Sequence, residues 1–101
     1  MRKQQTYVGL MEDEDGGLTE IGRVVMDARV FGLIDADQTC AGWNLGALQN
    51  LTDQVKARWD EYGALPSRLP DALRERHAAE YAAAIERARA AGWTADLSNE
   101  D

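Results

Sequence analysis

Cys40 is the only cysteine of this chain, and its thiol could act as a nucleophile. It lies in the segment GLIDADQTCAGWNLG, residues 32–46. A helical turn starting near Asp37 or Thr39 would place the thiol at a positive helix end, which lowers its pKa and favours the nucleophilic thiolate. The carboxylates of Asp35 and Asp37 act in the opposite direction, because nearby negative charge raises a thiol pKa. The alternative is a small buried apolar side chain, since free cysteine is among the residues most often buried. Cys40 is therefore the candidate reactive thiol.

The only histidine, His77, is the natural base to consider beside this thiol. It follows Leu73 and precedes Tyr81 by four residues each, which predicts an inward position on a helix face. Near Cys40 it would form a nucleophile–base pair. A lone histidine on an apolar helix face is more typically packed and hydrogen-bonded, so we predict no catalytic residue.

Metal binding has little support in the sequence. One cysteine and one histidine cannot form a zinc site of the usual kind within one chain. The acidic run 12–15 followed by Gly16 resembles part of a calcium loop, but Met11 and Gly22 then occupy the first and last ligand positions. We therefore expect no metal and no cofactor.

Large aromatic side chains are numerous for a core of this size, and aromatic residues dominate the binding energy of many protein interfaces. We expect the binding surface on the segment 33–46 and on the alanine-rich face of the last helix. The candidate residues are Leu33, Ile34, Asp35, Asp37, Trp43, His77 and Tyr81.

Three amphipathic helices are predicted to position these residues, over about 19–31, about 44–62, and from a start between 67 and 71 to about 91. Thr19 and Asn44 are typical N-cap residues of the first two. Gly32 is a typical residue after a helix end. Arg23 and Asp27 are spaced to pair on the outer face of the first helix. The fold class is therefore all-α, a small bundle of three main helices.

The predicted organisation has three parts. Residues 1–18 form a flexible or extended N-terminal arm, 19–93 the helical domain, and 94–101 a polar C-terminal tail. The connection around Cys40 is longer than a plain link between helices needs to be. We expect either a short extra helix over 35–42 or a binding loop there.

Composition limits the classes of partner. The chain has 101 residues and a net charge of −7, which excludes a basic face for nucleic acid or for an anionic membrane surface. Residues 1–17 have no apolar run after Arg2 and Lys3, unlike a secretory signal peptide. We expect a cytoplasmic protein.

The stretch Arg58-Trp59-x-Glu61-Tyr62-Gly63-x-x-Pro66 resembles a helix-end segment of sulfur-relay proteins of the DsrC/TusE type. Those proteins act through a cysteine near the C-terminus. Residues 93–101, WTADLSNED, contain none, so no site residue is transferred from this resemblance.

Together these patterns favour a non-enzymatic protein-interaction or accessory module, whose partner is another protein or a second copy of the chain. The alternative is a thiol-based function, as a sulfur carrier or redox sensor, through Cys40.

Overall fold

The computed structural model describes residues 6–92, and within them the chain forms a small all-α bundle, as predicted. The helices are α1 (Glu20–Val30), α2 (Leu45–Asp60) and α3 (Asp71–Ala90). Expectations for residues 1–5, for Trp93 and for the tail 94–101 lie outside the described residues.

Both predicted N-caps are present. The hydroxyl oxygen of Thr19 accepts a hydrogen bond from the backbone N–H of Gly22 at 2.9 Å. The side-chain oxygen of Asn44 accepts one from the N–H of Ala47 at 2.8 Å. Each cap satisfies a donor that the helix itself cannot, which is worth about 1 kcal/mol.

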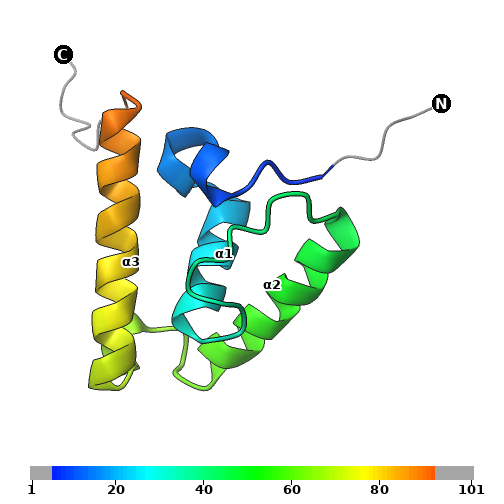
Figure 1. Cartoon of the computed structure of the whole chain (residues 1–101). Helices are drawn as coiled ribbons and strands as arrows, with labels where there is room; N and C mark the ends of the chain where they lie inside the picture. Colours follow the sequence, from blue (N-terminus) through cyan, green and yellow to red (C-terminus); the bar gives the residue numbers. More distant parts are fainter. Residues whose placement is uncertain (1–5, 93–101) are drawn as a thin grey trace, which may run out of the picture.

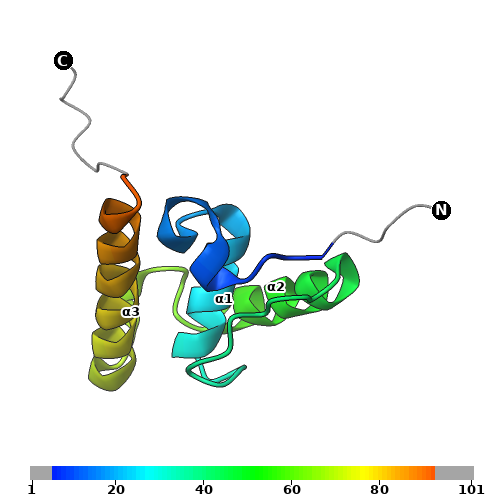
Figure 2. The same ribbon diagram turned by 45° about the horizontal axis from the view of Figure 1, so that its top comes forward.

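Helix α1 is the centre of the bundle. It lies between α3 and α2 and packs against both (Figures 1 and 2), while α2 and α3 also meet through the rings of Trp59 and His77. Its Val25, Met26 and Ala28 have no exposed surface. The short helix buries apolar surface on two sides, so it organises the core.

A single carboxylate joins the three helices. Asp27 of α1 accepts a hydrogen bond from the indole N–H of Trp59 in α2 at 3.0 Å, and one from the hydroxyl of Tyr81 in α3 at 2.8 Å. The prediction that Asp27 lies on the outer face of α1, paired with Arg23, is therefore wrong. An amphipathic pattern predicts that an aspartate faces solvent, because a buried charge is costly when it has no partner. Here two hydrogen-bond donors from neighbouring helices satisfy the carboxylate inside the bundle.

The connection from α1 to α2, residues 31–44, contains turns and no helix, so the alternative of an extra helix over 35–42 is wrong. The backbone N–H of Gln38 donates to the carbonyl of Asp35, and that of Trp43 to the carbonyl of Cys40. In Figure 1 both α1 and α2 begin at the upper end of the bundle. The connection is long because it has to run back along the whole bundle.

The described part of the N-terminal arm, residues 6–18, packs against the rest of the domain. Residues 6–9 are extended, and two short 3-10 helices follow, η1 (Leu10–Glu12) and η2 (Glu14–Gly17). Leu10 has no exposed surface. A short extended segment pairs poorly alone, but here the returning connection supplies its partner, which the sequence pattern did not show.

The end of this N-terminal segment packs on α3. Gly16 has φ 65°, and a Cβ built on it would lie 2.4 Å from the backbone nitrogen of Ala88. The guanidinium of Arg87 donates a hydrogen bond to the Gly16 carbonyl at 3.1 Å. Only glycine fits this position, because it allows both the positive φ and the close approach.

Candidate functional site

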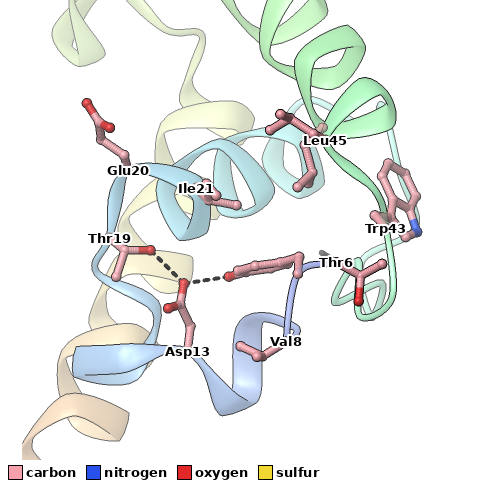
Figure 3. Close-up of a pocket in the computed structure, with 10 residues that line it drawn as sticks. Thr6, Val8, Asp13, Thr19, Glu20, Ile21, Trp43 and Leu45 are labelled. Carbon is pink, nitrogen blue, oxygen red and sulfur yellow. Dashed lines mark hydrogen bonds between the residues drawn. The ribbon is translucent and has the colours of Figure 1, made fainter. Parts of the chain in front are cut away.

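An open apolar groove of about 450 Å³ lies where the N-terminal segment meets the first turns of α1 and α2 (Figure 3). Three parts of the chain that are distant in sequence form its walls. Its lining residues, from first to last, are Thr6, Tyr7, Val8, Asp13, Thr19, Glu20, Ile21, Trp43, Leu45 and Leu48. We call this site the N-terminal groove.

Backbone hydrogen bonds hold the extended wall of the N-terminal groove. The N–H of Tyr7 donates to the carbonyl of Trp43 at 2.9 Å, and the N–H of Gly42 donates to the carbonyl of Tyr7 at 2.8 Å. The N–H of Leu10 donates to the carbonyl of Thr39 at 3.0 Å. The wall is thus tied to the connection between α1 and α2 at both of its ends.

A polar cluster fixes the same wall to the start of α1. The carboxylate of Asp13 accepts hydrogen bonds from the hydroxyl of Tyr7 at 2.6 Å and from that of Thr19 at 2.5 Å (Figure 3). Burial raises the pKa of Tyr7 far above its ordinary value, and its hydrogen bond to Asp13 raises it further. Tyr7 therefore stays protonated and keeps donating to Asp13.

Exposed apolar side chains border the groove. Leu45 is 75% exposed, Val8 57% and Ile21 38%. Leu45 and Ile21 lie in the first turns of their helices, one and two residues after the N-cap. Single exposed apolar residues are common on protein surfaces, but several around one hollow are typical of a binding site.

The chemistry of the groove favours binding over catalysis. Its ten lining residues include two carboxylates, Asp13 and Glu20, and no cysteine, histidine, lysine or arginine. Asp13 is already occupied by two hydroxyl donors. Such a lining offers apolar contact area and a few polar anchors, as in many recognition sites.

Cys40 is not among the residues that line the groove, and it has no exposed area. Burial raises the pKa of its thiol above the ordinary value, and the positive charge of Arg29 offsets part of that rise. Its backbone has φ 62°, and its N–H donates to the side-chain oxygen of Gln38. These features favour the alternative of a small buried apolar side chain in the core.

His77 lies inward, as its spacing predicted, at the three-helix junction. Its ring stacks on Tyr81 with centroids 4.6 Å apart and meets Trp59 edge-on at 5.7 Å. Its Nε2 is 4.0 Å from the carboxylate of Asp27. Tyr81 also has a pKa raised by burial and by Asp27. These contacts show that His77 and Tyr81 pack inside the bundle.

The other residues of the predicted binding surface differ in exposure. Leu33 and Ile34 are partly buried against the core, whereas Asp35 and Asp37 are exposed on the returning connection. Among the predicted surface residues, Trp43 alone lines the N-terminal groove.

Sequence reasoning missed Val8, Asp13, Ile21 and Leu45 as site residues. Ile21 and Leu45 were visible as apolar residues directly after a cap, which is one available signal. Nothing in the sequence indicated that Val8 and Asp13 approach them. Among residues 6–92, no group of three or more histidine, cysteine or acidic side chains is arranged to hold a metal ion.

Comparison of this chain with protein-family models, with curated proteins and with solved structures found no match. Within the described residues, no helix has the length and apolar character needed to cross a membrane.

Proposed function

We propose that this protein is a non-enzymatic interaction module, which holds apolar side chains of a protein partner in the N-terminal groove. The observation that carries the proposal is the exposure of Val8, Ile21 and Leu45 around one preformed hollow. An acidic cytoplasmic accessory protein of this kind would act by binding, with its bundle serving as a rigid support.

The geometry of the groove supports this function in a second way. Its walls are fixed by hydrogen bonds among residues 7, 13, 19 and 43, so the site is formed before a partner arrives. A preformed site loses little conformational entropy on binding. Burial of an exposed leucine side chain contributes about 2 kcal/mol.

Differential affinity capture from the native cell tests the proposal. Wild type would be compared with Leu45→Asp, which places a charge in the groove. The matched control is Leu65→Asp, because Leu65 is 47% exposed and does not line the groove. We expect proteins retained by wild type and by Leu65→Asp but lost by Leu45→Asp.

Equal capture by all three proteins would contradict the proposal. Light scattering on the same samples identifies a second copy of the chain as the occupant, if wild type self-associates and Leu45→Asp does not.

A further inference from the structure

Within residues 6–92, the charged side chains that line the N-terminal groove are both carboxylates. Glu20 lines the groove and is exposed, and Asp13 forms part of its polar cluster. The neighbouring Glu12, Glu14 and Asp15 on η1 and η2 are exposed as well. No lysine or arginine is among the lining residues.

Two basic side chains of the described residues lie near this rim. The charge of Arg23, one turn after Glu20 in α1, acts on Tyr81 of α3. Arg87 donates to the carbonyl of Gly16, and its charge lowers the pKa of Tyr7 slightly against the larger rise caused by burial and Asp13. One arginine therefore offsets part of the negative charge of the rim, and the carboxylates remain in excess.

The positive ends of two helices also border the groove, and a carboxylate stands beside one of them. Glu20 lies in the first turn of α1, where its charge offsets the helix dipole. The first turn of α2 has no acidic residue, and its cap, Asn44, is neutral. The partial charge of this one helix end is smaller than the full charges of the carboxylates at the rim.

We propose that the partner segment bound in the N-terminal groove is basic, with apolar side chains that enter the groove and flanking lysine or arginine side chains that face the acidic rim. This inference rests on the proposed function and adds the chemistry of the partner. An acidic segment would bring like charges together at the rim, which costs affinity. The net charge of −7 adds long-range attraction for a basic partner.

The test uses random 12-residue peptides displayed on phage and selected against the full chain, with Leu45→Asp for counter-selection. We expect the retained peptides to combine an apolar anchor with an excess of lysine and arginine. One retained peptide is then synthesised in two forms, as selected and with each basic residue replaced by glutamine. The substituted form is expected to bind about tenfold more weakly, with less dependence on salt.

A pair of protein variants locates the effect. Glu20→Gln removes a rim charge, whereas Glu75→Gln removes a charge at another exposed position, on α3. We expect Glu20→Gln to weaken binding of the basic peptide by about threefold and Glu75→Gln to leave it unchanged.

The outcomes separate the two proposals. Peptides that depend on Leu45 but are neutral or acidic would overturn the basic partner and leave the groove function intact. Equal effects of Glu20→Gln and Glu75→Gln would also overturn it, as would a second copy of the chain found in the groove. If no peptide binding depends on Leu45, the proposed function itself fails.

Discussion

The three-helix junction and the N-terminal groove contain the same hydrogen-bonded pair, a tyrosine hydroxyl that donates to an aspartate. At the junction, Tyr81 donates to Asp27, and Trp59 supplies a second donor. At the groove, Tyr7 donates to Asp13, and the second donor is a threonine hydroxyl.

The two regions differ in what lies around the pair. The rings of Trp59, His77 and Tyr81 pack against one another at the junction. Beside the groove, Val8 and Leu45 remain exposed. The comparison indicates that such a pair lies inside the bundle where aromatic rings close over it, and beside an open groove where they do not.

The largest expected effect is the loss of the junction carboxylate. Asp27→Ala leaves the indole N–H of Trp59 and the hydroxyl of Tyr81 without their acceptor. We expect the free energy of unfolding, measured by urea denaturation, to fall by about 3 kcal/mol. Asp53→Ala, at an exposed position of α2, is the control. A loss below about 1 kcal/mol would show that the carboxylate does not join the helices.

A smaller and more local effect is expected at the groove. Asp13→Ala removes the acceptor of Tyr7 and Thr19 and should lower the free energy of unfolding by about 1.5 kcal/mol. It should also loosen residues 7–10, whose backbone is hydrogen-bonded to residues 39, 42 and 43 on either side of Cys40. Alkylation of native Cys40 is then expected to accelerate more than it does in a junction variant of equal stability. Equal alkylation rates would mean that the segment opens only with the whole bundle.

Alkaline pH tests both pairs together. The pKa values of Tyr7 and Tyr81 are raised in the folded protein, so folding favours their protonated forms. This stabilisation is complete below the ordinary tyrosine pKa of about 10 and is lost as the pH rises above it. The melting temperature should therefore fall above about pH 10. Tyr81→Phe and Tyr7→Phe should each make that fall less steep, and an unchanged fall would contradict the assignment.

The smallest effect on stability is expected at the groove rim. Leu45→Asp should change the free energy of unfolding by no more than about 0.5 kcal/mol, because the side chain is 75% exposed. The same variant should abolish partner capture. Strong destabilisation by Leu45→Asp would show that the rim belongs to the core and not to a binding surface.

Local signals were sufficient to predict the helices. The caps at Thr19 and Asn44 and the stop at Gly32 are short-range features, and each lies where the sequence placed it. The inward position of His77 also followed from helical spacing alone.

The groove could not be predicted, because it depends on contacts between distant residues. Asp27 and Asp13 are aspartates at positions that a pattern assigns to solvent, and only the three-dimensional structure supplies their donors. The packing of residues 6–10 on 39–43 has no periodic signature, because it is one short extended pairing. For this reason the sequence predicts Cys40 as a candidate site residue and does not predict Leu45.

The contact between Gly16 and the end of α3 determines when the domain can be completed during synthesis. Arg87 donates to the carbonyl of a residue 71 positions earlier in the chain. Such a long loop is entropically costly to close, and contacts of this kind form late in folding. A nascent chain that still lacks α3 therefore cannot anchor η2, and the ribosome releases α3 only after the first two helices have emerged. The packing of the N-terminal segment on α3 is thus completed only once nearly the whole described chain has been translated.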